Sequence, residues 1–234
     1  MTLTTFCEAM GIATVPVGVY DAPDSAPFAP VIPLKQCIFD HYQDFQSGAT
    51  VVLNQTSKGC PGCGHWMLGK GRFPNKEVMI AFLTDKEGLR ESAQLTEAWL
   101  DAHPTHAPQN GNIFIGPVRD ELSEYLWTIT FFVNPDQLSF LIYAAHYYAH
   151  PDDPDPVLAS FGSGCGLMHS MFPDLSRPQA IIGATDIAMR QHLPPDILAF
   201  TVTVPMLTRF LSLDDGHSFL DKSFLERLIA ARAQ

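Results

Sequence analysis

The stretch YLWTITFFVNPDQLSFLIYAAHYYAH, residues 125–150, decides how this chain folds. It is long and apolar and carries a single acid, Asp136. Asn134 is a preferred N-cap residue and Pro135 suits the first position of a helix, so the stretch divides into a buried strand over 125–133 and a helix that follows it. Each half is too short to cross a bilayer, which argues against a membrane protein.

Strand and helix signals alternate along the rest of the chain. Apolar runs predict further strands at 14–20, 49–54, 112–118, 157–161, 180–182 and 198–204, and helical spacing predicts helices at 35–46, 78–103, 206–213 and 218–233. This order predicts an α/β or α+β fold, in which helices pack around a mixed sheet. The length of 234 residues predicts a single compact domain over residues 1–234, closed by C-terminal helices within 206–233.

Composition and charge narrow the classes of partner. Apolar residues make up 46% of the chain and charged residues 17%, which predicts a large core and leaves neutral surface for a homodimer interface. A formal charge of −11 repels phosphate backbones and anionic lipids, so we expect no nucleic acid and no membrane as a partner. The N-terminus has no basic region and meets Glu8 before any long apolar run, so we expect a cytoplasmic protein.

The cysteines indicate where the chemistry lies. Five cysteines, an odd number, without an export signal favour metal or thiol chemistry over a disulfide framework. Cys60 and Cys63 form a CxxC pair in a glycine-rich turn predicted at 57–64. Cys165 lies in a second glycine-rich turn, residues 161–166, whereas Cys37 lies in a predicted helix and Cys7 is expected to pack in the core.

Several ligand sets are compatible with these positions. Four thiolates from Cys37, Cys60, Cys63 and Cys165 would hold an iron–sulfur cluster, most simply a four-iron four-sulfur cluster. A zinc site would instead combine Cys60, Cys63 and Cys165 with one histidine. A covalent c-type haem is disfavoured because Gly64 separates the CxxC from the next histidine.

The candidate histidine ligands are His41, His65 and His169. His41 stands four residues after Cys37, and His169 stands four residues after Cys165, so each pair would share a face if its segment were helical. His65 follows the CxxC pair directly after Gly64. These positions keep zinc open as the alternative to an iron–sulfur cluster.

Functions without a metal also remain open. Cys60 and Cys63 could be a dithiol redox pair, or Cys165 could be a nucleophile beside His169. The glycine turns could also cradle an anion in a non-catalytic small-molecule binding protein.

An iron–sulfur cluster would serve electron transfer, or it would activate a small substrate in an oxidoreductase or lyase. The partner would then be a small molecule or a redox protein.

Charged residues near these turns add two expectations. Asp186 and Arg190 stand four apart and are expected to form an ion pair on a helix. Lys58, Lys70 and Arg72 flank the CxxC turn, where positive charge would stabilise thiolates or attract an anionic substrate.

The order of the short motifs resembles the uncharacterised family catalogued as domain of unknown function 169, over roughly residues 14–205. The matching features are Pro16-Val17-Gly18-Val19, Cys37, the Cys60-Pro61-Gly62 turn running to Leu68-Gly69, Ile115-Gly116-Pro117, Asn134-Pro135-Asp136-Gln137-Leu138 with Ala144-Ala145, and the turn at Cys165. The resemblance implies a cytosolic, prokaryotic, single-domain protein and names no activity. The chain departs from the family pattern at two places. At position 63 it has Cys, where a glycine is at least as usual in the family. Residues 183–190 contain the Gly, Asp and Arg of a further turn but no cysteine.

Overall fold

A computed structural model describes residues 1–54, 56–57, 59–69, 73–103, 105, 108–214 and 216–232. Within these residues, eight strands form one sheet in the order β2-β3-β4-β1-β5-β8-β7-β6. The strands are β1 (Val17–Ala22), β2 (Val31–Pro33), β3 (Thr50–Leu53), β4 (Asn112–Pro117), β5 (Leu126–Val133), β6 (Val157–Leu158), β7 (Ala180–Gly183) and β8 (Leu198–Thr203). β2 pairs in parallel with β3 and β6 with β7, whereas the other pairs are antiparallel. The predicted mixed sheet is therefore confirmed.

Residues 125–150 supply a central strand of this sheet and the helix that follows it. β5 lies between β1 and β8, and helix α6 (Pro135–His146) follows it directly. Asn134 caps α6, because its side chain accepts the backbone N–H of Gln137 at 2.9 Å and the Gln137 side chain accepts the N–H of Asn134 at 2.9 Å. The strand, the cap and the helix predicted from the sequence are confirmed.

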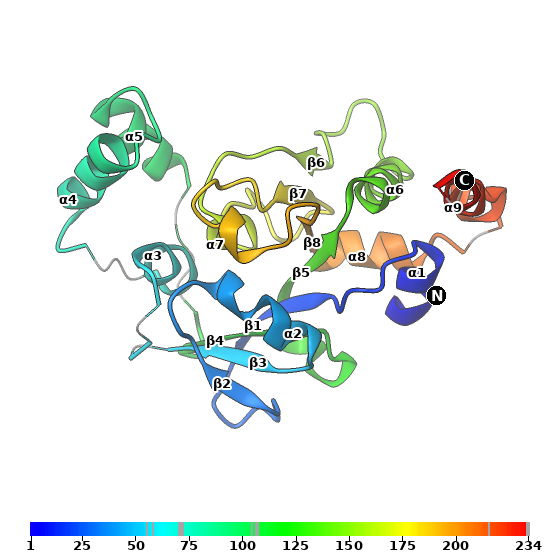
Figure 1. The fold of residues 1–234 in the computed structure, drawn as a ribbon, viewed down its shortest axis with the longest axis horizontal. Coiled ribbons are helices and arrows are strands. Elements are labelled where there is room, and N and C mark those ends of the chain that lie inside the picture. The colour runs from blue at the N-terminus through cyan, green and yellow to red at the C-terminus, as the bar shows by residue number, and fades with distance from the viewer. Residues whose placement is uncertain are drawn as a thin grey trace.

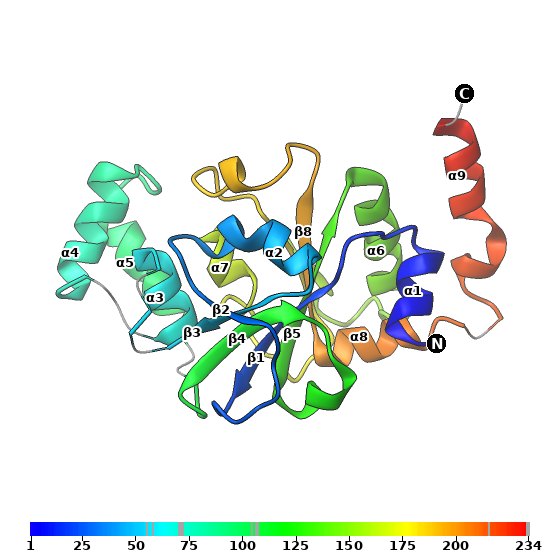
Figure 2. The same cartoon turned by 60° about the horizontal axis from the view of Figure 1, so that its bottom comes forward.

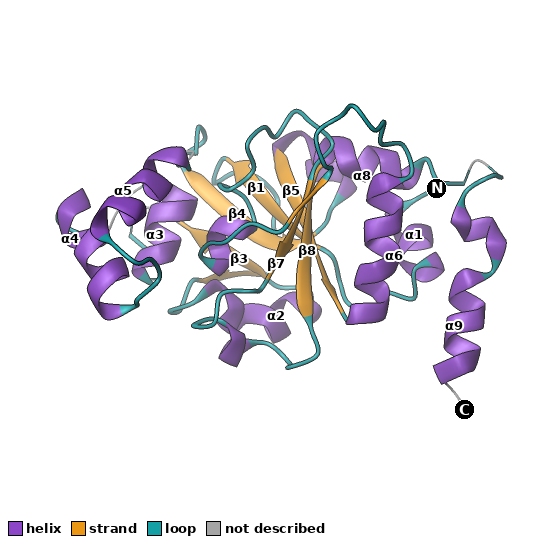
Figure 3. Cartoon of the chain, turned by 90° about the horizontal axis from the view of Figure 1, so that it is seen from above, coloured by secondary structure: helices purple, strands orange, loops and turns teal. Residues whose placement is uncertain are grey.

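Alternation along the strands gives the sheet two apolar faces. Val17 and Val19 of β1 point into one core, whereas Tyr20 packs in a cluster on the opposite side. In β5, Phe132 joins the core of Val17, whereas Phe131 joins a second large core. Helices must therefore cover both faces, which gives the layered architecture seen from above in Figure 3.

Different helices contribute to the two cores. The first core contains residues of α2 (Tyr42–Gln46), α3 (Pro61–Leu68), α5 (Ala93–Ala102), α7 (Gly164–Leu167) and the 3-10 helix η1 (Ile38–His41). The second core contains residues of α1 (Leu3–Ala9), α6 and α8 (Val204–Leu211). Figure 2 shows α2, α3 and α7 on the same side of the strands. This side carries the candidate site.

Two predicted helices are interrupted. The helix predicted at 78–103 is divided into α4 (Lys76–Ala81), a π-helical turn η2 (Phe82–Lys86) and α5, because Gly88 adopts a left-handed conformation with φ 61° and Ser92 caps a new helix. The C-terminal prediction corresponds to η5 (Phe219–Lys222) and α9 (Phe224–Arg232). Figure 1 shows α4 and α5 at one end of the molecule and α9 at the other.

The remaining helical turns are η3 (Asp120–Tyr125) and η4 (Arg190–His192). Every helix in the described part of the chain is too short or too polar to span a bilayer.

Candidate functional site

The CxxC pair begins a helix rather than lying in a turn. Cys60 is the N-cap of α3, Pro61 occupies the first helical position, and the Cys60 Sγ accepts the backbone N–H of Cys63 at 3.4 Å. The predicted glycine-rich turn at 57–64 is therefore wrong for residues 61–64. Pro at the first helical position was the local signal for this helix start.

The second cysteine turn packs against the start of α3. Ser163 precedes α7, and its Oγ lies 3.1 Å from the Sγ of Cys165. A Cβ atom added at Gly62 would lie 3.2 Å from the Ser163 Oγ and 3.8 Å from the sulfur atoms of both Cys60 and Cys165. Gly62 therefore lets α3 and α7 approach closely enough for the Cys60 and Cys165 sulfurs to share one small region.

Cys63 and Cys37 complete the group. Hydrogen bonds with the side chains of Cys165 and Cys60, together with burial, raise the pKa of Cys63 well above its usual value. Burial, together with the neighbouring Cys60 and Cys165, raises the pKa of Cys37 to about 12. The structure thus brings Cys37, Cys60, Cys63 and Cys165 together from three separate segments.

The four cysteines differ in their exposure and mutual contacts. Cys63 and Cys165 are buried, whereas Cys37 and Cys60 are only partly buried. Among the described residues, no group of three or more Cys, His, Asp or Glu side chains is arranged around a point that would hold a metal ion. Binding a metal would therefore require these thiols to lose their protons and to turn toward one common point.

Cys37 does not lie inside a helix. It precedes η1 with an extended backbone (φ −101°, ψ 145°), and its N–H donates to the Asp40 carboxylate at 3.0 Å. His41 lies at the end of η1, and both of its ring nitrogens are engaged: Nε2 accepts the Lys35 N–H at 3.1 Å and Nδ1 lies 2.7 Å from Asp44. His41 is therefore not available as a ligand in this arrangement.

The other two candidate histidines lie beside tryptophans. His65 belongs to α3, its ring meets that of Trp66 edge-on at 4.6 Å, and burial lowers its pKa. His169 is fully buried and stacks on Trp127 with ring centroids 4.2 Å apart. Because α7 ends at Leu167, His169 and Cys165 do not share a regular helical face.

The segment between β7 and β8 forms a hydrogen bond with the turn that carries Cys165. The Asp186 carboxylate accepts the N–H of Gly164 at 3.1 Å and of Ala188 at 3.0 Å, whereas Arg190 donates to backbone carbonyls, including that of Pro195 at 2.8 Å. The predicted ion pair between Asp186 and Arg190 is wrong, because the residues between them do not form a helix. Asp186 instead holds the beginning of α7.

The same segment reaches the turn that carries Cys37. The His192 Nδ1 lies 2.6 Å from the carboxylate of Asp40, which also accepts the Cys37 N–H. Ser163 and Asp40 lie two and three residues from the cysteines that they contact, whereas the contact of His192 with Asp40 joins distant parts of the chain and no local pattern indicates it. The basic residues Lys58, Lys70 and Arg72 lie outside the described residues.

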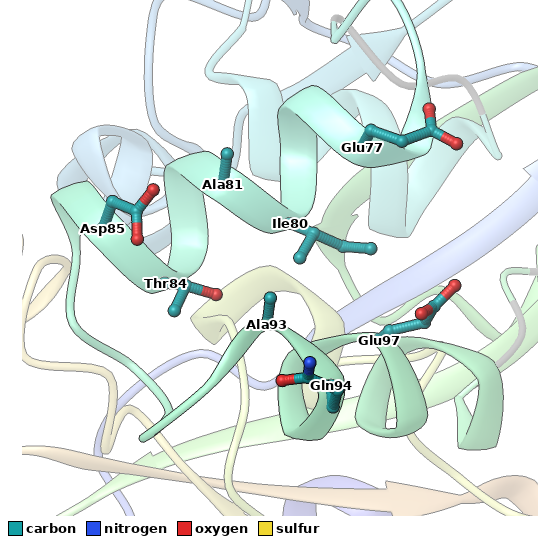
Figure 4. A pocket seen from close by; sticks show the side chains of 8 residues that line it. All are labelled: Glu77, Ile80, Ala81, Thr84, Asp85, Ala93, Gln94 and Glu97. Atoms are coloured by element: carbon teal, nitrogen blue, oxygen red, sulfur yellow. The ribbon is translucent and has the colours of Figure 1, made fainter.

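Cys7 lies elsewhere, and so does the pocket drawn in Figure 4. Cys7 belongs to α1 and to the second core, as its predicted packing role requires.

The pocket of about 330 Å³ is lined by residues of α4, η2 and α5, among them Glu77, Asp85 and Glu97, and by none of the cysteines. The cysteine group is thus distinct from that pocket.

The fold and the site define a mixed α/β protein with four cysteines gathered on one face of its sheet. Residues 5–212 match the family model of domain of unknown function 169, described as uncharacterised ArCR, so the chain belongs to this family. The resemblance stated from the sequence is therefore confirmed. Comparisons with curated proteins and with solved structures give no match.

Proposed function

We propose that the protein binds an iron–sulfur cluster through Cys37, Cys60, Cys63 and Cys165 and uses it for electron transfer or for activating a small substrate. The observation that carries the proposal is the meeting of four cysteine side chains that are up to 128 residues apart in the sequence. Four thiolates are the usual ligand set of a four-iron four-sulfur cluster. A cytoplasmic location would keep these thiols reduced and able to bind.

The distribution of contacts favours a cluster over a single ion. All four cysteines belong to the first core or pack against it, but among the described residues no three of them are arranged around a point that would hold one ion. A cluster spans more space than one ion does and therefore suits this wider arrangement. His41, the histidine nearest to Cys37 in sequence, has no ring nitrogen left to offer.

The apolar surroundings also suit a cluster. Trp66, Met168 and Phe39 belong to the same buried core as Cys63 and Cys165, and a dry environment of this kind tunes the reduction potential of a cluster. The two partly buried cysteines, Cys37 and Cys60, lie toward solvent. A small molecule or a redox partner would therefore approach from their side.

Zinc is the second candidate, favoured by one specific observation. A Cβ at Gly62 would lie 3.8 Å from the sulfurs of both Cys60 and Cys165, and Cys63 follows Gly62 directly in the chain. Thiolates around one zinc ion, with Zn–S bonds of about 2.3 Å in a tetrahedron, lie about 3.8 Å apart. A zinc site would therefore use these three cysteines, with Cys37 or a histidine as the fourth ligand.

Anaerobic purification followed by iron, acid-labile sulfide and zinc analysis distinguishes the candidates. We expect about four iron and four sulfide per chain, as a four-iron cluster requires. Cys63→Ser and Cys165→Ser should lose this content, and Cys7→Ser is the matched control that should keep it. Anaerobic protein with neither iron nor sulfide would end the proposal, and about one zinc per chain would establish the second candidate.

A further inference from the structure

Among the described residues, Arg90 contacts aromatic rings but no acidic side chain, and it lies near the second cysteine turn. The guanidinium carbon of Arg90 lies 4.4 Å from the ring centroid of Phe161 and 5.6 Å from that of Trp99. Its Nε is buried and has no acceptor, and within the described residues Arg90 forms no ion pair or hydrogen bond. In a chain with 25 acidic and 14 basic residues, a partly buried arginine that pairs with no acid calls for an explanation.

A second unsatisfied donor lies beside it. Trp99 is 9% exposed, and its indole Nε1 is buried without an acceptor. Both Arg90 and Trp99 thus present an N–H group that no oxygen of the described residues accepts. Buried donors are nearly always paired in folded proteins, so two together indicate an acceptor other than the described residues.

The position of this pair connects it with the cysteines. Phe161 stands four residues before Cys165, and the Trp99 ring packs edge-on against Phe161 at 5.7 Å and against Trp66 at 5.4 Å. Trp66 belongs to the helix that Cys60 caps. The unsatisfied donors therefore adjoin both segments that carry the central cysteines. Phe161 is 45% exposed, so this group lies next to the surface, and rotation of the Phe161 ring would open the two buried N–H groups to a ligand.

We propose that Arg90 and Trp99 form a binding subsite for the carboxylate of a small organic acid, beside the cysteine site. A guanidinium group matches the planar, two-oxygen geometry of a carboxylate, and the indole N–H supplies a further donor. One arginine balances one negative charge, which suits a carboxylate better than a phosphate dianion. The role of this acid as the substrate of the cysteine site rests on the proposed function, whereas its binding does not.

Acetate is the simplest probe, and the indole N–H resonances of the ¹⁵N-labelled protein are the readout. The chain has three tryptophans, and Trp99→Phe identifies the Trp99 signal. We expect acetate to shift that signal saturably and inorganic phosphate to bind more weakly. Arg90→Gln should weaken acetate binding at least tenfold, whereas Arg177→Gln, which removes an exposed arginine paired with Asp174, should leave it unchanged.

A second variant, Trp99→Phe, tests the subsite even if Arg90→Gln does not fold. In Trp99→Phe, which keeps an aromatic ring, the Arg90 Nε–H resonance reports binding, and we expect acetate affinity to fall at least threefold. A Trp99 signal that acetate does not move, or that moves equally in Arg90→Gln, overturns the subsite, and tighter binding of phosphate overturns its specificity. If the protein binds acetate but contains no iron, the subsite stands and the iron–sulfur proposal ends. If it contains iron but does not bind acetate, the iron–sulfur proposal stands and the subsite ends.

Discussion

Gly164 directly precedes Cys165 and leaves little space for a side chain, so Gly164→Ala is a sharp test of the site. An added Cβ would lie 2.8 Å from the Cγ of Met189 and 2.8 Å from the Cε2 of Phe39. Phe39 is 1% exposed and Met189 is 4% exposed, so neither side chain can move into solvent. Restoring a contact of 3.4 Å would require a displacement of about 0.6 Å, and overpacking of this kind costs about 1–3 kcal/mol.

Urea unfolding of the variant measures this cost, and Gly183→Ala is its control. A Cβ at Gly183 would meet its nearest neighbour, Ala199 Cβ, at 3.5 Å, which is an ordinary contact. We expect Gly183→Ala to change the free energy of unfolding by less than about 0.5 kcal/mol. Because Gly164 precedes Cys165, Gly164→Ala should also lower the iron content. Equal stability of the two variants would refute the close packing of α7 against Met189 and Phe39.

Two further predictions concern groups outside the cysteine site. Burial raises the pKa of Cys7 to about 11. In folded, metal-free protein at pH 8, iodoacetamide should therefore alkylate Cys7 about 100-fold more slowly than an exposed cysteine, as mass spectrometry would show. A rate like that of an exposed thiol would contradict the burial of Cys7. Hydrogen bonds from Arg232 lower the pKa of Asp136, so the pair that joins α9 to α6 should persist above the ordinary aspartate pKa of about 3.9 and be lost as the pH falls through the lowered value. Hydrogen exchange of α9, corrected for the intrinsic effect of pH, should accelerate in that acid range. In the Arg232→Gln variant it should already be accelerated at neutral pH. Exchange that neither change alters would show that the pair does not hold α9.

Local features of the fold could be predicted from the sequence because their causes are local. Asn134, Pro135 and Gln137 form a cap whose hydrogen bonds join residues three apart, and the apolar strand before them needs no distant partner to be recognised. The start of α3 was missed although Pro61 indicated it, because a cysteine is not a usual N-cap residue. The interruption of the helix at 78–103 was missed because it depends on one left-handed glycine, Gly88.

The contacts that build the site could not be derived in this way. Asp186 binds the backbone of Gly164, which is 22 residues away, and the local alternative, a helical pair with Arg190, fails because the chain between them is not helical. The meeting of Cys37 with Cys165 depends on the order of eight strands, which one sequence does not reveal. Local periodicity predicts elements, whereas the distances between elements are set by the packing of the whole sheet.

The position of the site nevertheless follows from that sheet. Cys37 comes four residues after β2 ends at Pro33, Cys60 seven after β3 ends at Leu53, and Cys165 seven after β6 ends at Leu158. Each cysteine segment thus leaves the carboxyl end of a strand that belongs to one of the two parallel pairs.

These pairs occupy opposite edges of the sheet, yet α3 and α7, which follow β3 and β6, pack against each other. The two helices meet because each lies over the same face of the sheet: α3 packs on β4 and α7 on β7, and residues of both belong to the first core. Carboxyl ends of parallel strands are common ligand sites in open sheets, and in this protein the segments that leave two such pairs meet over one face. The thiols gather there because α3 packs against α7, so a change that moved these two helices apart would separate Cys60 from Cys165 while leaving each cysteine turn intact.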